Sequence, residues 1–196
     1  MNSIDENIQT WRNVKLKDWI GYYENIIPRD RCENFIGVAK SSGQLKPSTY
    51  ANSSGKIKDS DKRVVMDDMW IPDNTDWHKT INDFFGKVIK KYSETFEKFS
   101  CQRHCGFRMN RYSTGGFMSE HTDNIHHSHG QEYGFPQVSA LLFLNDNYGG
   151  GDFVVSGNEY KTKVGSGIIF PSNFMFPHEV KKVTSGERWS IVTWLM

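Results

Sequence analysis

The first hundred residues carry apolar positions at helical spacing, with one break. Residues 28–43 are predicted to form a helix, because Pro28 suits a first helical turn and Gly43 is a natural end. A second helix is predicted to run from Asp76, as its cap, to about Phe99. Its apolar stripe, at spacings of three and four, indicates packing against a sheet and consists of Trp77, Ile81, Phe84, Phe85, Val88 and Tyr92.

Segments of strand type surround these helices and fill the rest of the chain. An edge strand is predicted within residues 19–27 and another strand at 63–69. After Cys105, short apolar runs alternate with glycine, proline and Asn-Asp turns; these runs are FRMNRYS, FMSEH, QVSALLFLN, GDFVV, GIIFP and WSIVTWL. So many short strands in under a hundred residues predict a barrel or a double-sheet jelly roll.

The pattern therefore predicts one domain over residues 1–196, mainly β with N-terminal helices. Residues 1–104 would supply supporting helices and edge strands, and residues 105–196 would form the jelly-roll core. Within the first part, residues 48–62 are polar and rich in serine and glycine, which predicts a loop. This loop is either a mobile lid over a site or plain surface.

The composition argues against nucleic-acid-binding, disulfide-rich and membrane proteins. Lys and Arg number 24 and Asp and Glu 23, so the chain has no bulk charge that would attract a nucleic acid. Three cysteines without a dense framework favour free thiols in a reducing compartment. With no signal-peptide pattern and no long apolar run, we expect a cytoplasmic protein without a membrane partner.

One pair of residues offers metal-binding chemistry. His121 and Asp123 lie two positions apart, and in a strand such residues point to the same face. His178, which follows Pro177 at the start of another predicted strand, can complete the set. Two histidines and one carboxylate on one face of an octahedron suit non-haem Fe(II), whereas zinc more often takes a closed tetrahedral site.

The last predicted strand adds a binding group for a small diacid. Arg188 lies ten positions after His178, and its planar guanidinium could hold a carboxylate through two hydrogen bonds. Ser190 shares the face of Arg188 and could add a hydroxyl. Trp194 is also in phase, as a wall of the same site.

These motifs resemble the prolyl 4-hydroxylase branch of the Fe(II)- and 2-oxoglutarate-dependent dioxygenases. The resemblance covers about residues 105–196 and rests on RYSTGGFMSEHTD, YGGGDFVV and GSGIIFPSNFMFPHEVKKVTSGERWSIVTW. It implies a double-stranded β-helix, a cupin-like jelly roll backed by α-helices. It also implies that His121, Asp123 and His178 bind iron, and that Arg188 and Tyr112 bind 2-oxoglutarate.

The resemblance implies hydroxylation of a prolyl residue in a peptide or protein, with Fe(II), 2-oxoglutarate and O2. Ascorbate would serve to keep the iron reduced. Many peptidyl-prolyl hydroxylases of this branch carry a substrate-binding arginine after the His-x-Asp loop, where this chain has Phe135, Pro136 and Gln137. A free amino acid or another small molecule therefore stays open as the substrate.

Two further classes of function are weighed against these. Asn110-Arg111-Tyr112 also resembles the DNA-alkylation repair oxygenases, but those typically have a second arginine where this chain has Trp194, and the near-neutral charge argues against a nucleic-acid partner. A cupin-like module that binds a metal without turnover would not need the diacid-binding pair Tyr112 and Arg188.

Two other clusters carry weaker metal signals. His126, His127 and His129 could bind a second metal, but a polar loop near the site is the simpler interpretation. Cys101, His104 and Cys105 lack the usual zinc spacing and a fourth ligand.

Overall fold

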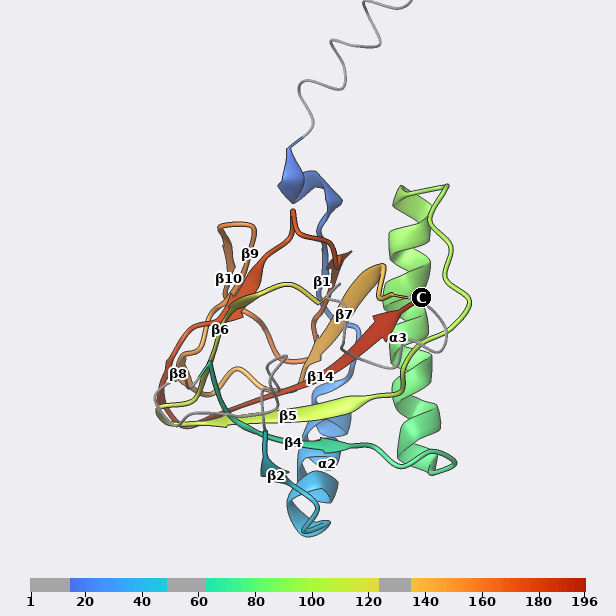
Figure 1. Ribbon diagram of the computed structural model, residues 1–196. Coiled ribbons are helices and arrows are strands. Elements are labelled where there is room, and N and C mark those ends of the chain that lie inside the picture. Colours follow the sequence, from blue (N-terminus) through green and yellow to red (C-terminus); the bar gives the residue numbers. More distant parts are fainter. Residues whose placement is uncertain (1–14, 49–62, 124–134) are drawn as a thin grey trace, which may run out of the picture.

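The computed structural model describes residues 15–48, 63–123 and 135–196 and consists of two β-sheets backed by two helices (Figure 1). A 3-10 helix, η1 (Leu16–Trp19), precedes α2 (Arg29–Ser41) and α3 (Asp76–Thr95). The strands are β1 (Gly21–Tyr23), β2 (Lys46–Pro47), β3 (Val64–Val65), β4 (Asp67–Trp70), β5 (Arg108–Ser113), β6 (Phe117–His121), β7 (Val138–Phe143), β8 (Gly149–Gly150), β9 (Phe153–Val155), β10 (Asn158–Tyr160), β11 (Gly167–Pro171), β12 (His178–Val180), β13 (Val183–Ser185) and β14 (Glu187–Leu195).

The larger sheet has seven strands in the order β1-β11-β7-β14-β5-β4-β2, and the smaller has five in the order β10-β9-β12-β6-β3. A short pair, β13-β8, completes the strands of the described residues. All pairings are antiparallel, and in the larger sheet β4 and β5 are the one pair of neighbours that are consecutive in the described sequence. This is the two-sheet, crossed-over arrangement that the many short strands predict.

Two apolar clusters cover the two faces of the larger sheet. On one face, α2 and α3 pack through residues such as Phe35, Phe85 and Val88 against odd-numbered β14 residues such as Ile191. On the other face, even-numbered residues such as Val192 point towards the smaller sheet. Figure 1 shows the helices on the far side of the large sheet from β6, β9 and β10. The strand period of two thus separates a structural face from a face that is available for a site.

Some predicted boundaries were wrong. The expected strand at 19–27 is shorter, at Gly21–Tyr23, because Leu16–Trp19 forms a 3-10 turn. Helix α3 ends at Thr95 instead of Phe99. Thr75, and not Asp76, is its cap, because the Thr75 hydroxyl accepts a hydrogen bond from the His78 amide.

The predicted loop at residues 48–62 lies outside the described residues apart from Ser48. No helix in the described ranges is both long and apolar enough to cross a membrane.

Candidate metal and cosubstrate site

The three predicted metal ligands meet between β6 and β12 of the smaller sheet. His121 and His178 are directly opposite in the antiparallel pairing of these strands, and Asp123 follows two residues after His121. One ligand atom from each residue lies within 4.8 Å of the others. In the described part of the chain, this is the one group of three or more potential ligands that could hold an ion.

The distances suit a single small cation. Nε2 of His121 lies 3.5 Å from Oδ1 of Asp123, and Nε2 of His178 lies 3.3 Å from Oδ2. Two ligands about 2.1 Å from a metal and at right angles to each other are about 3 Å apart. The donor set of two imidazoles and one carboxylate on one side therefore fits Fe(II), with positions left for other ligands.

Both imidazoles are oriented by the backbone. Nδ1 of His121 lies 2.9 Å from the Ser119 carbonyl, and Nδ1 of His178 lies 3.2 Å from the Phe176 carbonyl. A carbonyl only accepts hydrogen bonds, so each Nδ1 carries the proton and donates it. Each Nε2 faces Asp123 and is the ring atom left for the metal, whose binding would displace any proton on it.

Asp123 is held by a buried pair of serines. The Ser139 hydroxyl donates to Oδ2 of Asp123 at 2.6 Å and lies 2.7 Å from the Ser172 hydroxyl. Burial opposes ionisation of Asp123, but the neighbouring His178 and His121 hold its pKa well below the usual range. Asp123 is therefore an ionised and oriented carboxylate, as a metal ligand must be.

Arg188 lies on the neighbouring sheet, facing the smaller sheet. It is completely buried, and its guanidinium carbon lies 5.3 Å from the ring centres of both Tyr112 and Phe143. Its Nη1 donates to the Ser190 hydroxyl at 3.3 Å. Nε and Nη2 have no hydrogen-bond partner among the described residues.

A buried guanidinium with two unused donors is costly unless an anion binds it. Nε and Nη2 form one edge of the guanidinium plane, and this edge matches the two oxygens of a carboxylate. The arrangement thus fits the distal carboxylate of 2-oxoglutarate, the ligand that the sequence analysis predicts for Arg188.

Tyr112 and Arg188 are directly opposite in the pairing of β5 with β14. Burial raises the pKa of Tyr112 above its usual value, although Arg188 and Arg108 oppose that rise. The phenol is therefore neutral at physiological pH and can donate a hydrogen bond to a carboxylate. Among the described residues its hydroxyl contacts only the Met118 sulfur, at 3.8 Å, which is a weak acceptor.

Trp194 lies nearer to the metal ligands than to the arginine. Its directly opposite residue on β7 is Ser139, which holds Asp123. The Trp194 ring also lies beside that of Trp70, with 6.3 Å between ring centres. Trp194 thus forms a wall at the metal end of the face, whereas Ser190 lies at the cosubstrate end.

Two polar residues of the site were missed by the sequence interpretation. Ser139 lies in the otherwise apolar run VSALLF. A single hydroxyl in a fully buried strand needs a polar partner, and this was the signal in the sequence that could have indicated its role. Asn110 is two residues before Tyr112 and so on the same face of β5. It is 3% exposed, and its Oδ1 has no partner among the described residues.

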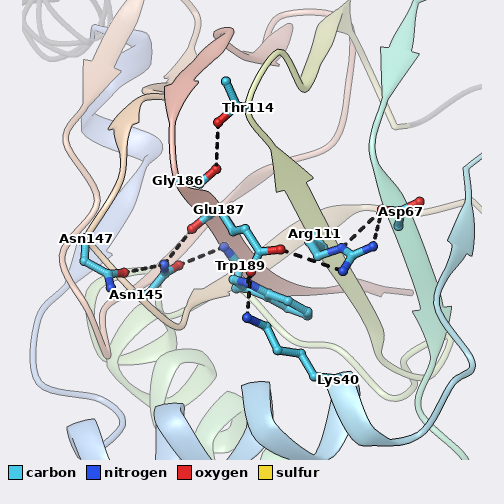
Figure 2. Close-up of polar contacts among 9 residues, drawn as sticks. All are labelled: Lys40, Asp67, Arg111, Thr114, Asn145, Asn147, Gly186, Glu187 and Trp189. Carbon is cyan, nitrogen blue, oxygen red and sulfur yellow. Dashed lines mark hydrogen bonds and ion pairs between the residues drawn. The ribbon is translucent and has the colours of Figure 1, made fainter.

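On the opposite face of β14, a polar network fixes the start of the strand (Figure 2). The Glu187 carboxylate lies 2.7 Å from Nζ of Lys40 and 3.7 Å from Nη1 of Arg111. Asn145 accepts from the Trp189 amide and donates to the Glu187 carbonyl. These contacts hold both neighbours of Arg188 on the outer face, while strand alternation places Arg188 itself on the inner face.

The remaining metal candidates contribute no second site to the described structure. His126, His127 and His129 lie outside the described residues. Cys101 and Cys105 are free thiols, and His104 accepts a hydrogen bond from the Gly106 amide.

Comparison with known proteins confirms the resemblance. Residues 107–196 match the family model of the 2OG-Fe(II) oxygenase superfamily. A PKHD-type hydroxylase of Rippkaea orientalis is 41% identical over 91 residues, which are 43% of this chain and 40% of that protein. Prolyl 3-hydroxylase 2 of Mus musculus is 39% identical over 69 residues, which are 32% of this chain and 10% of that protein. The matched segments therefore span less than half of these relatives.

A solved structure matches nearly the whole chain. It is a prolyl hydroxylase of Trichoplax adhaerens in complex with a peptide fragment of a hypoxia inducible factor oxygen degradation domain. The TM-score is 0.70 with 14% sequence identity, and the match covers 100% of this chain and 93% of that one. The chain thus has the double-stranded β-helix fold of these oxygenases, as predicted.

Proposed function

We propose that this protein is an Fe(II)- and 2-oxoglutarate-dependent oxygenase that hydroxylates a prolyl residue in a peptide or protein. One observation carries the proposal. The His121, Asp123 and His178 cluster on the smaller sheet faces the same interior as Arg188 of the larger sheet, a buried arginine with two unused donor atoms. A passive metal site has no use for such an arginine, whereas a site for a metal and a diacid needs it.

Each residue has a defined part in this proposal. His121, Asp123 and His178 would hold the iron, and Ser139 would keep the Asp123 carboxylate in place. Bound Fe(II), with O2 and 2-oxoglutarate, supplies the oxidation that replaces a substrate C–H bond by C–OH and converts 2-oxoglutarate to succinate and CO2.

The cosubstrate would be positioned by the neighbouring strands. Arg188 would bind its distal carboxylate along the Nε and Nη2 edge, with hydroxyl hydrogen bonds from Tyr112 and Ser190. Because Arg188 is inaccessible to solvent, these charge-assisted hydrogen bonds would form away from competing water.

A prolyl residue is the proposed target for two reasons. Prolyl 3-hydroxylase 2 is among the sequence relatives, and the prolyl hydroxylase of similar fold was solved with a peptide. Trp194 is directly opposite Ser139, which holds Asp123, and Trp70 lies beside Trp194; these aromatic rings suit the apolar ring of proline.

The experiment is a mass-spectrometric search for hydroxylation. The purified protein is incubated in air with Fe(II), 2-oxoglutarate, ascorbate and proline-containing peptides. We expect one oxygen atom to be added to a prolyl residue, with succinate formed in equal amount. Succinate formation with free amino acids as the only hydroxylated compounds would overturn the prolyl-peptide part, and the absence of succinate with all substrates would overturn the oxygenase.

A further inference from the structure

The interior face of β5 carries a second arginine that the proposed cosubstrate site does not use. Arg108 is four residues before Tyr112, and so its side chain lies on the same face of the strand. Its directly opposite neighbours are Val192 on β14 and Trp70 on β4. Arg108 is therefore on the site face but displaced from the arginine that is assigned to 2-oxoglutarate.

The guanidinium of Arg108 has no protein partner of opposite charge in the described ranges. No ion pair or hydrogen bond joins it to another described residue, and its Nε is buried without a partner. Arg111, three residues further along the same strand, points to the other face and pairs with both Asp67 and Glu187. The positive charge of Arg111 is thus neutralised by two carboxylates, whereas Arg108 has no carboxylate of the described residues within ion-pair distance.

Aromatic side chains flank Arg108 on the site face. Its guanidinium carbon lies 4.9 Å from the ring centre of Trp194. Trp194 is directly opposite Ser139, whose hydroxyl donates to Asp123 at 2.6 Å. Trp70, 48% exposed, lies beside Trp194, with 6.3 Å between the ring centres. Arg108 is half-buried, so solvent reaches it, and Trp194 lies between it and the serine that holds the metal-binding carboxylate.

Two more polar groups face the same region without neutralising Arg108. Asp68 and Asn110 are directly opposite each other on β4 and β5. Asp68 forms no ion pair with Arg108 within 4.0 Å, and the buried Asn110 carbonyl oxygen is unpartnered among the described residues. Asp68 and the Asn110 carbonyl oxygen accept hydrogen bonds, so they suit amide N–H groups of a bound chain. Of these three residues, only Arg108 has a positive charge that can bind an anion.

We propose that Arg108 binds a carboxylate of the substrate, so that the enzyme selects prolyl residues with an acidic group close by. This inference rests on the proposed function. The carboxylate can come from an Asp or Glu side chain beside the proline or from the C-terminus of a peptide. Both present two oxygens to the guanidinium edge, and the test separates them.

The test measures peptide binding, independently of turnover. The protein is loaded with Mn(II) and a non-reactive mimic of 2-oxoglutarate. Peptides that differ only beside the proline, with Glu, Gln or Lys, are titrated by calorimetry. A Gln peptide that ends at the residue after proline is compared as its free acid and as its amide. We expect an acidic peptide to bind about 10–100-fold more tightly than its neutral counterpart, since one charge-assisted pair is gained.

Substitutions then assign the preference to one residue. Arg108→Gln should abolish the preference for the acidic peptide, and Arg108→Glu should make the Lys peptide the preferred one. Arg111→Gln removes an equal charge from the same strand and serves as the matched control, in which the preference should persist. Circular dichroism of each variant, with retained binding of the 2-oxoglutarate mimic, verifies that the fold and the cosubstrate site are intact.

The outcomes distinguish this inference from the proposed function. Equal binding of the Glu, Gln and Lys peptides together with equal binding of the free acid and the amide, or an acidic preference that survives in Arg108→Gln, would overturn the inference while the prolyl hydroxylase stands. The absence of hydroxylation in all peptides would overturn the proposed function itself. A preference for the free acid over the amide, with no effect of Glu, would identify a C-terminal carboxylate as the ligand.

Discussion

Replacement of Arg188 by methionine should have opposite effects on stability and on cosubstrate binding. Methionine retains much of the length of the side chain but removes the charge and the unused donors at Nε and Nη2. In the free protein these donors are buried without a partner, so their loss should stabilise the fold. In the complex with 2-oxoglutarate they would bind its carboxylate, so their loss should weaken binding.

The stability change follows from the contacts of Arg188. Removal of two donor atoms that are buried without a partner should raise the free energy of unfolding by about 4 kcal/mol in total. Against this, the variant loses the bond to Ser190 and the contacts with the Tyr112 and Phe143 rings, together about 2.5 kcal/mol. The variant should be more stable by about 1.5 kcal/mol, which raises the Tm by about 3–6 °C for a chain of this size.

The binding change is larger. Two charge-assisted hydrogen bonds in a buried site are worth about 3–5 kcal/mol, so the Kd for 2-oxoglutarate should rise about 10²–10⁴-fold. Differential scanning calorimetry with and without Mn(II) and 2-oxoglutarate measures both effects. The wild-type Tm should rise on addition of 2-oxoglutarate, whereas that of Arg188→Met should not.

Arg111→Met is the control, because Arg111 pairs with Asp67 and Glu187 on the other face. It should lower the Tm and leave the response to 2-oxoglutarate unchanged. If Arg188→Met lowers the Tm of the free protein and keeps wild-type affinity for 2-oxoglutarate, the assignment of Arg188 is refuted.

Three further predictions concern the metal, the outer network and a buried thiol. Asp123→Ala should abolish succinate formation while circular dichroism shows an intact fold; turnover at the wild-type rate would contradict the metal site. Burial opposes ionisation of Glu187, but Lys40 and its other partners lower its pKa below 4.5. The stabilisation is therefore present at neutral pH and is lost as the pH falls through that lowered pKa, so Glu187→Gln should cost about 0.5–1 kcal/mol at pH 7 by urea unfolding and progressively less as the pH is lowered into the acid range. A cost that stays constant as the pH is lowered would exclude ion pairing of Glu187 as its source. Burial raises the pKa of the Cys32 thiol to about 12, so iodoacetamide at pH 8 should label it only after unfolding, and rapid labelling of the folded protein would contradict its burial.

Much of the site was predictable because strand periodicity fixes which side chains share a face. His121 and Asp123 lie two apart, and Arg188 and Ser190 are in phase on the last strand. The motif spacing also nominated His178, although only the pairing of β12 with β6 brings it opposite His121. The sequence thus predicted the chemistry of the site more fully than the contacts that assemble it.

The contacts that sequence analysis missed depend on register between distant strands. Ser139 supports Asp123 only because β7 of the larger sheet faces the end of β6 in the smaller one, and Ser172 is close because it follows β11, which lies beside β7. Arg108 and Arg111 are three apart on one strand, and no local signal tells which of them finds acidic partners. Short strands such as β12 and β13 have three residues each, too few for a periodic pattern.

In the proposed enzyme, His121, Asp123 and His178 hold Fe(II) beside a site for 2-oxoglutarate. Anaerobic titration of the metal-free protein with Fe(II) and 2-oxoglutarate, followed by visible absorption, tests it most directly. We predict a metal-to-ligand charge-transfer band that saturates at one equivalent of iron, fails to form in Asp123→Ala, and decays with formation of succinate when air is admitted. The absence of both the band and succinate in the wild-type protein would contradict the account.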